Sequence, residues 1–389
     1  MARIVAHRPC QKVNNGGTVT AMRKTFIALT ALLAASASSL LGQASANIAA
    51  GRAQPSPLAP SEIVANSPKA DWTAIAASDL LVMDLAPDAK GKPRRVVIQL
   101  MPPPFSQGWI GNIRKLAAAH WWDGTAINRV QDNYVVQWGD PNADDKAKAK
   151  PLPSDLMSVP ESCYVVRFDD DLCQSSDAAT SPAEAAARFA SGAAAEAADA
   201  ASIEPFEDPS VSSTKSKSAP EGWHQRDSVA PWVQFYKGWP LASGDETKNP
   251  YFWPVHCYGM VGVGRDLSPN TGTGAELYTV IGHAPRHLDR NIALVGRVIE
   301  GIEYLSSLPR GHGALGFYDL AQGDERTGIV AVRLGTEVQG LPAYEYLSTE
   351  SQSFATYADA RANRRDAFFI RPAGGADICN IPVPVRRVK

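Results

Sequence analysis

Two blocks of short apolar runs, separated by turn residues, constrain the fold of this chain most strongly. The first block holds four such runs, at residues 80–85, 95–100, 126–130 and 134–138. The second block holds three, at residues 276–281, 292–297 and 329–334. Short apolar runs bounded by Gly, Pro, Asn and Asp are typical of β-strands, so the sequence predicts a mainly β domain.

Helical patterns are fewer than strand patterns. Trp109, Ile110, Ile113 and Leu116 recur at helical spacing and predict a helix over about residues 106–120. Helices are also predicted at three other places along the chain. These are residues 300–308, residues 354–364 and an Ala-rich stretch at 182–201.

A long segment of different composition separates the two blocks. Residues 142–250 combine a polar Lys/Asp/Pro section, the Ala-rich stretch, a Ser/Pro/Lys linker at 208–220 and a section rich in aromatic residues. We interpret them as an insertion into a domain that spans residues 79–340, with the aromatic side chains packing back onto that domain. Residues 341–389 then form a C-terminal extension, for which we predict a strand-like end around Cys379.

The N-terminal segment has the order of a secretory signal peptide. Residues 1–46 carry five Lys and Arg and no Asp or Glu, followed within that segment by a small, apolar run at 25–41 and an Ala-x-Ala site at 44–46. Met22 is a candidate for the true start, and a membrane anchor is the alternative interpretation. Residues 47–68, rich in Ala, Pro and Ser, are interpreted as a flexible leader.

Charge excludes one class of partner. The formal net charge is -2, and removing the five positive charges of residues 1–46 takes it to -7. Because phosphate binding needs clustered Lys and Arg, we expect no nucleic-acid partner for the exported chain. We also expect no stable membrane insertion, since no later segment is long and apolar enough to span a bilayer.

Export changes the interpretation of the cysteines. Cys10 precedes the cleavage site, which leaves Cys163, Cys173, Cys257 and Cys379. An even number in an oxidising compartment favours two disulfides, although free buried thiols stay an alternative. Of the three possible pairings, proximity favours Cys163–Cys173 with Cys257–Cys379. Neither Cys-x-x-Cys spacing nor clustered His is present, so no metal site is expected.

One motif holds groups that can act on a substrate. Arg129 lies between apolar neighbours on a predicted strand, and Tyr134 and Gln137 follow a few residues later. A guanidinium beside an apolar surface is costly to bury unless it has partners. By chemistry alone, the favoured interpretation of this pattern is an Arg held by a salt bridge at the rim of a sheet.

At this motif the sequence resembles the cyclophilins. In that family the segment runs Tyr-Asp-Gly-Thr, Phe-His-Arg-Val and Phe-Met-x-Gln-Gly-Gly-Asp-Pro. The matching positions here, in the same order and spacing, are residues 123–125, 129–130, 137 and 139–141. Further matches to the family lie at residues 259–261, 268–271, 274–278, 287–291, 295–298 and 300–301. The resemblance covers about residues 80–141 and 255–334.

The resemblance implies a fold and an activity. Cyclophilins are eight-stranded antiparallel barrels capped by two helices, and they are peptidyl-prolyl cis/trans isomerases (rotamases). We therefore expect a periplasmic or secreted isomerase that binds proline-containing, unfolded or partly folded proteins and needs no cofactor. The alternative is a cyclophilin-shaped peptide-binding or chaperone-like module that catalyses weakly. The oligomeric state stays open.

The resemblance also implies roles for individual residues. Arg129 stands at the position of the catalytic arginine, which stabilises the twisted X-Pro amide without covalent chemistry. The positions that bind substrate in the family are occupied here by Tyr134, Val135, Gln137, Glu276, Tyr278, His287, Leu288 and Ile292.

Several of these positions depart from the family pattern. Tyr134 and Tyr278 replace Phe and so add a hydroxyl group, and Glu276 replaces Gln. His287 replaces a Trp at the rim of the pocket, and Ile292 replaces a His on its floor. We expect these changes to alter specificity or rate, and we hypothesise that Glu276 pairs with Arg129 and restrains it.

Overall fold

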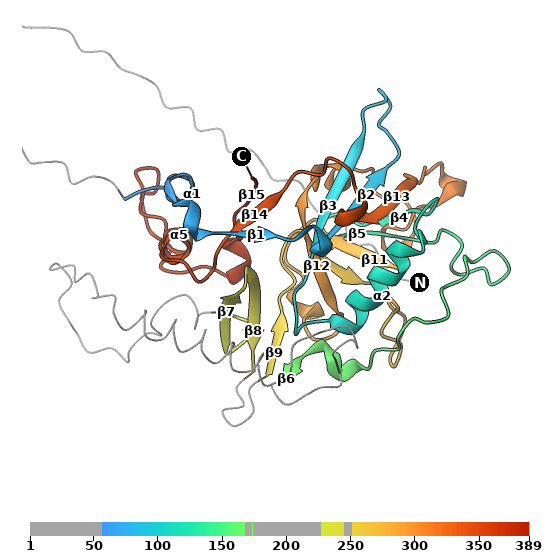
Figure 1. The fold of residues 1–389 in the computed structure, drawn as a ribbon, viewed down its shortest axis with the longest axis horizontal. Helices are drawn as coiled ribbons and strands as arrows, with labels where there is room; N and C mark the ends of the chain where they lie inside the picture. Colours follow the sequence, from blue (N-terminus) through green and yellow to red (C-terminus); the bar gives the residue numbers. More distant parts are fainter. Residues whose placement is uncertain (1–56, 168–172, 174–226, 245–250, 389) are drawn as a thin grey trace, which may run out of the picture. The chain divides into compact units, whose positions relative to one another are not determined.

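The apolar runs of both blocks pair into one antiparallel sheet of eight strands (Figure 1). The computed structural model describes residues 57–167, 173, 227–244 and 251–388. The eight strands are β2 (Leu80–Leu85), β3 (Arg94–Leu100), β4 (Ala126–Val130), β5 (Val135–Gly139), β10 (Met260–Val263), β11 (Leu277–Val280), β12 (Leu294–Glu300) and β13 (Ile329–Leu334). All seven predicted strand runs are present, and β10 was not among them.

The sheet is nearly closed into a barrel. Its strand order is β13-β2-β3-β12-β10-β11-β5-β4, which puts β13 and β4 at the two ends. These ends adjoin, because the N–H of Ile127 donates to the carbonyl of Thr327 at 2.9 Å and that of Ile329 to Thr125 at 2.8 Å. Closure provides hydrogen-bond partners for the backbone N–H and C=O groups that the edge strands of an open sheet expose. The expected barrel fold is confirmed.

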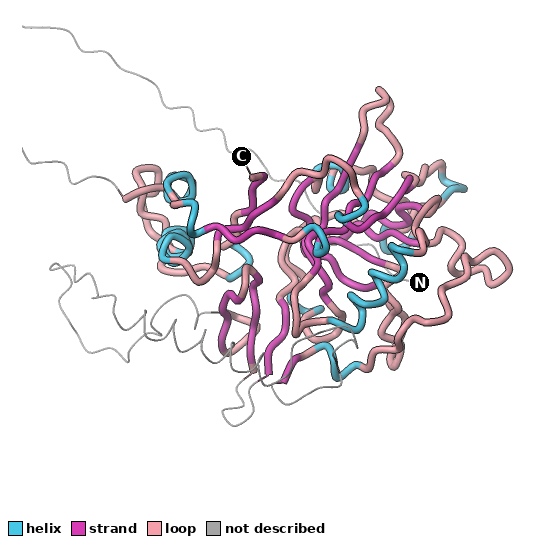
Figure 2. Tube along the Cα trace, viewed as in Figure 1, coloured by secondary structure: helices cyan, strands magenta, loops and turns pink. Residues whose placement is uncertain are grey.

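Large side chains fill the barrel, and a helix (cyan in Figure 2) packs against its strands. Helix α2 (Gln107–Ala118) buries Trp109, Ile113 and Leu116 against the strands, as its spacing predicted. Helix α4 (Glu303–Ser306) is much shorter than the predicted 300–308. The reason is that β12 continues to Glu300 and that Gly301 has a φ of +83°, in the left-handed region.

A second, three-stranded sheet joins segments from both ends of the described chain. It consists of β1 (Trp72–Ile75), β14 (Tyr344–Leu347) and β15 (Val385–Arg387), with β14 in the centre. Helices α1 (Pro60–Asn66) and α5 (Gln352–Ala362) contact each other beside it. Part of the expected flexible leader is thus helical, because Ile63 and Val64 pack against the core.

Strands from the insertion pair with the residues that directly follow it to form a third sheet. Its four strands are β6 (Val166–Arg167), β9 (Tyr251–Pro254), β8 (Trp239–Ser243) and β7 (Trp232–Tyr236), in that order. Phe235, Trp239 and Trp253 from this sheet are buried in the main core cluster, as expected for the aromatic section. The predicted helix at 182–201 and the linker at 208–220 lie outside the described residues.

Both expected disulfides are present, Cys163–Cys173 and Cys257–Cys379. The prediction of a strand at Cys379 is wrong, because Asp377 accepts a hydrogen bond from the Cys379 N–H and begins a 3-10 helix there. The 3-10 helices are η1 (Lys69–Asp71), η2 (Ala77–Asp79), η3 (Glu161–Tyr164), η5 (Arg286–Leu288), η6 (Ala314–Gly316), η7 (Leu320–Gln322), η8 (Gly335–Glu337) and η9 (Ile378–Asn380).

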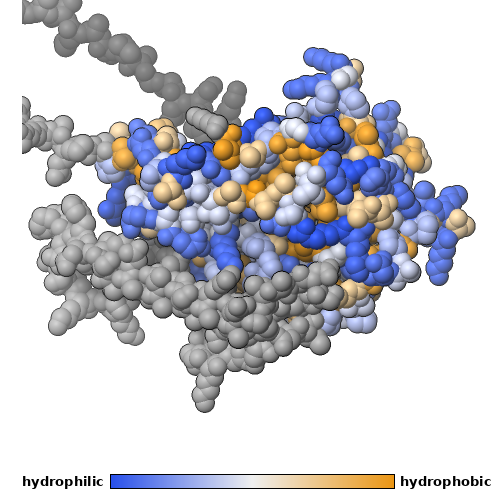
Figure 3. Space-filling model, in the orientation of Figure 1, coloured by the Kyte–Doolittle hydropathy of each residue, from blue (hydrophilic) through white to orange (hydrophobic). Residues whose placement is uncertain are grey.

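The surface around the barrel is mixed in polarity. In Figure 3 the turn between β2 and β3 projects as a hydrophilic tip, in keeping with its Asp88, Lys90 and Lys92. Within the described residues, helices reach neither the length nor the apolar character that crossing a bilayer takes.

Candidate functional site

Four adjacent strands put one residue each into a row across the barrel wall. Gly262 on β10 pairs with Tyr278 on β11, Tyr278 pairs with Gln137 on β5, and Gln137 pairs with Arg129 on β4. Residues directly opposite one another in a sheet project from the same face. Their strand neighbours, such as Val136 and Leu277, belong to the barrel core, so the row lies on the outer face.

Arg129 is held at one end of this row by hydrogen bonds from all three of its nitrogens. Its Nη1 donates to Gln137 Oε1 at 3.3 Å, its Nε donates to the carbonyl of Leu315 at 2.7 Å, and its Nη2 donates to Gln131 Oε1. The rings of Tyr134 and Phe317 lie 5.6 and 5.4 Å from its Cζ, within cation–π range.

The charge of Arg129 has no carboxylate partner among the residues that the structure describes. Burial lowers the pKa of Arg129, but a guanidinium stays protonated at physiological pH. Three of its five N–H groups are used, which leaves one on each terminal nitrogen for a ligand. The interpretation of Arg129 as one half of a salt bridge is therefore wrong.

Beside the row lies an apolar cluster that is separate from the barrel core. Val135, Tyr278 and Val280 are buried in it. Tyr134, Leu288 and Ile292 are partly buried against them. Since both Val135 and Val280 alternate with core residues along their strands, this cluster also faces outward.

His287 borders this cluster. Its ring stacks on Tyr134, with the ring centroids 6.1 Å apart and the planes within 10°. His287 is exposed and follows Arg286 in η5, so it stands at the solvent-facing edge of the apolar cluster. The structure thus brings the residues predicted to bind a ring together next to Arg129.

Glu276 precedes β11 and lies over the backbone of Gly139. A Cβ atom at residue 139 would fall 2.0 Å from Glu276 Oε1, so only glycine leaves room for this carboxyl group. Burial raises the pKa of Glu276 to about 7, although a hydrogen bond with Gln137 acts in the opposite direction. The hypothesis that Glu276 pairs with Arg129 is wrong, because Gln137 contacts both groups and stands between them.

The sequence analysis did not assign His256 to the site, nor the three residues Gln131, Leu315 and Phe317 that contact Arg129. His256 is fully buried, and its Nε2 lies 2.8 Å from the hydroxyl of Tyr278. Its Nδ1 lies 2.9 Å from Asp289 Oδ1. The sequence held one hint of this contact, because a Tyr among apolar side chains needs a partner for its hydroxyl, and Tyr278 stands at a position that binds substrate in the family.

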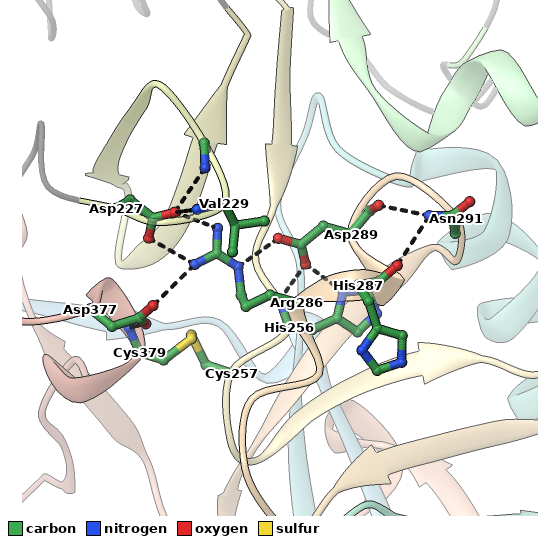
Figure 4. A network of polar contacts seen from close by, with 11 residues as sticks. Asp227, Val229, His256, Cys257, Arg286, His287, Asp289, Asn291, Asp377 and Cys379 are labelled. Atoms are coloured by element: carbon green, nitrogen blue, oxygen red, sulfur yellow. Dashed lines mark hydrogen bonds and ion pairs between the residues drawn. A yellow bond between two sulfur atoms is a disulfide. The ribbon is translucent and has the colours of Figure 1, made fainter.

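The polar contacts of His256 continue into a larger network (Figure 4). Arg286 Nε donates to Asp289 Oδ2 at 2.7 Å, and its terminal nitrogens contact Asp227 at 2.8 and 3.2 Å. A longer contact of 3.5 Å reaches Asp377 in the C-terminal extension. The side chains of Arg286, Asp227 and Asp289 are almost entirely buried, so this network is part of the interior.

The arrangement combines a fixed cation with an adjacent apolar surface. Such a pair fits a ligand group that carries an apolar ring next to a polar amide. Groups of three or more potential metal ligands are absent from the described residues.

Comparison with known proteins points in the same direction. Residues 109–315, more than half of the chain, match the family model described as cyclophilin type peptidyl-prolyl cis-trans isomerase/CLD. The crystal structure of cyclophilin AquaCyp293 from Hirschia baltica is similar, with a TM-score of 0.51 and 20% identity over 82% of this chain and 94% of that one. A cyclophilin type peptidyl-prolyl cis-trans isomerase from Cryptosporidium parvum gives a TM-score of 0.31 and 12% identity over 66% of this chain and 97% of that one. No curated protein matches the sequence.

Proposed function

This chain belongs to the cyclophilin-type peptidyl-prolyl cis-trans isomerase family, and we propose that it accelerates cis/trans exchange of X-Pro bonds in exported proteins. Amide resonance imposes a barrier of about 18–20 kcal/mol on this exchange, which makes it slow without a catalyst. No covalent bond breaks during the rotation. A catalyst therefore needs to bind the twisted amide more tightly than either planar form.

Arg129 is the group proposed to do this. In the twisted amide the nitrogen lone pair is no longer delocalised, so the nitrogen becomes a better hydrogen-bond acceptor. The free N–H groups of Arg129 can donate to it or hold the adjacent carbonyl. The single observation that carries the proposal is the position of Arg129 beside the apolar cluster of Tyr134, Val135 and Tyr278. Arg129 is cationic there, and within the described part of the chain it has no carboxylate partner.

The apolar cluster is proposed to hold the pyrrolidine ring of the substrate. Tyr134, Val135, Tyr278, Leu288 and Ile292 offer side chains of matching polarity. Rotation about the X-Pro amide bond requires the proline ring to stay fixed while the carbonyl group before it turns. A pocket that binds the ring meets the first requirement. His287, exposed and stacked on Tyr134, is proposed to contact the residues next to proline.

Gln137 and Glu276 are proposed to bind the substrate backbone through hydrogen bonds. Gln137 contacts Arg129 on one side and Glu276 on the other, so its amide orientation is set from both directions. A protonated Glu276 donates a hydrogen bond and an ionised one only accepts. Glu276 is therefore expected to donate to a peptide carbonyl at low pH, and only to accept from a peptide N–H once it is ionised.

Export is supported by the disulfides and by the order of the N-terminal residues. Two disulfides are typical of proteins in oxidising compartments. The proposed signal peptide at residues 1–46 lies outside the described residues. The proposed clients are unfolded or partly folded proteins with accessible prolines, in the periplasm or outside the cell.

The proposal is tested by measuring exchange of a short X-Pro peptide by NMR with the mature protein. We expect exchange well above the spontaneous rate. A second candidate function, peptide binding with weak catalysis, is favoured by the exposed Phe317 ring near Arg129, because it covers part of the guanidinium. Saturable binding of the peptide with exchange at the spontaneous rate supports this alternative.

A further inference from the structure

The hydroxyl group of Tyr278 does not face the site in which its ring lies. Tyr278 is 4% exposed and its ring belongs to the apolar cluster, yet its hydroxyl oxygen lies 2.8 Å from Nε2 of the fully buried His256. The two rings are nearly parallel, with planes within 8° and centroids 6.3 Å apart. The Tyr278 ring, which the substrate would contact, is thus hydrogen-bonded through its hydroxyl to a histidine in the protein interior.

The direction of each hydrogen bond in this chain of groups can be assigned. Although burial alone would raise the pKa of Asp289, its contacts with His256 and Arg286 hold the pKa below the ordinary value, so Asp289 is a carboxylate and only accepts. His256 therefore donates from Nδ1. Burial lowers the pKa of His256, which leaves its Nε2 unprotonated and able to accept from the Tyr278 hydroxyl.

Gly262 makes this contact sterically possible. It is the cross-strand partner of Tyr278, and a Cβ atom at residue 262 would fall 2.3 Å from the Tyr278 hydroxyl oxygen. Any larger residue at this place would push the phenol away. Gly262 therefore leaves space for a tyrosine hydroxyl at residue 278, and His256 offers this hydroxyl an acceptor. A phenylalanine at residue 278 would need neither the space nor the acceptor.

His256 is itself held on several sides (Figure 4). Asp289 Oδ1 accepts from both the backbone N–H of His256, at 3.0 Å, and its ring. Arg286 fixes the other carboxylate oxygen of Asp289 and is in turn held by Asp227. The next residue, Cys257, is covalently tied to Cys379. The imidazole therefore has little freedom to move with the ring it contacts.

We propose that His256 is a positioning residue for the isomerase site, which holds the ring of Tyr278 in the orientation that receives the substrate proline. This role rests on the proposed function, because it requires Tyr278 to contact substrate. Asp289 and Arg286 act one step further away by fixing His256. The added hydroxyl of Tyr278, relative to the family's phenylalanine, is thus a structural anchor that gives its one proton to His256 and has none left to donate to the ligand.

The test is a double-mutant cycle on exchange of an X-Pro peptide. Tyr278→Phe removes only the hydroxyl. His256→Asn keeps a donor toward Asp289 and loses the acceptor for Tyr278. We expect each single variant to lower kcat/KM by about fivefold to tenfold, the loss of one buried hydrogen bond. The double variant is expected to be no slower than Tyr278→Phe alone. Equal losses from His256→Asn in both backgrounds would overturn the proposal.

A second measurement does not depend on turnover. The flip rate of the aromatic ring at residue 278, measured by NMR, is expected to rise in His256→Asn and in Tyr278→Phe. Tyr357 is the matched control, because its buried hydroxyl donates to the carbonyl of Pro382 in the C-terminal extension, and its flip rate is expected to stay unchanged. An unchanged flip rate at residue 278 in either variant overturns the proposal, even if the wild-type protein shows no isomerase activity. If His256→Asn does not fold, Tyr278→Phe alone decides by the same two measurements.

Discussion

Arg129 and Gln137 occupy facing positions on β4 and β5, and Arg129 Nη1 donates to Gln137 Oε1 over 3.3 Å. The register of the two strands brings about this contact, since it makes them direct cross-strand neighbours on the outer face of the barrel. Tyr278 follows in the same row on β11. The barrel wall thus aligns the cation, the amide and the aromatic ring that the proposed reaction needs.

Removal of the Gln137 amide is expected to impair the site without unfolding it. In Gln137→Ala, Arg129 Nη1 loses its fixed acceptor, so the guanidinium gains freedom before it meets the substrate. We expect kcat/KM to fall about tenfold, equivalent to about 1.4 kcal/mol. Steady-state exchange rates check this, and near-wild-type unfolding temperature is the control. A fall in stability that accounts for the lost activity would contradict this role.

Glu276 predicts a pH dependence of stability. Its folded-state pKa is about 7, above the ordinary 4.5. Well below pH 4.5 the carboxyl is protonated in both the folded and the unfolded state, so it does not lower the free energy of unfolding. As pH rises from there to about 7, the unfolded chain releases the proton first, so the free energy of unfolding falls. The loss is at most about 3 kcal/mol.

Denaturant unfolding of wild type and Glu276→Gln at pH 5 and pH 8 checks this expectation. The amide does not titrate, so the variant is expected to gain stability relative to wild type as pH rises. A difference between the two proteins that is the same at both pH values would rule out burial of a titrating carboxyl at this position.

The two disulfides are expected to contribute unequally to stability. Cys257–Cys379 closes a separation of 122 residues and Cys163–Cys173 one of only 10. Because the entropy removed from the unfolded chain grows with loop length, we expect a loss of about 4–5 kcal/mol for the first and about 2–3 kcal/mol for the second. Paired Cys→Ser variants, compared by denaturant unfolding, measure the order. The reverse order would contradict the loop-entropy argument.

Seven of the eight strands of the barrel, all except β10, were predictable because each combines apolar residues with flanking turn residues. Strand β1 was missed because Trp72–Ile75 is only four residues long and buried only at its two ends. Strands β7 and β8 were missed because their section of the insertion reads as a collection of aromatics, and Pro240 interrupts the pattern of β8. The helix at residue 300 was overestimated because the left-handed Gly301 was read as part of it.

The candidate site could be predicted only as far as the motif extends. Arg129, Tyr134 and Gln137 are close in sequence, and the family pattern brought in the residues of the second block. The contact between His256 and Tyr278 depends on the register of β10 with β11 and on the space above Gly262. Such information is absent from spacing along the chain. For the same reason, the separation of Glu276 from Arg129 by Gln137 became visible only in three dimensions.

The most direct test of the account is the exchange rate of an X-Pro peptide with Arg129→Ala. Arg95→Ala is the matched control, because Arg95 on β3 pairs with Asp84 on β2. Neither residue belongs to the row that contains Arg129. We predict that Arg129→Ala lowers kcat/KM about a hundredfold, as expected when a donor to the transition state is lost. The Arg95→Ala control is predicted to keep the wild-type rate. Equal exchange rates for Arg129→Ala and wild type would contradict the central role given to this guanidinium.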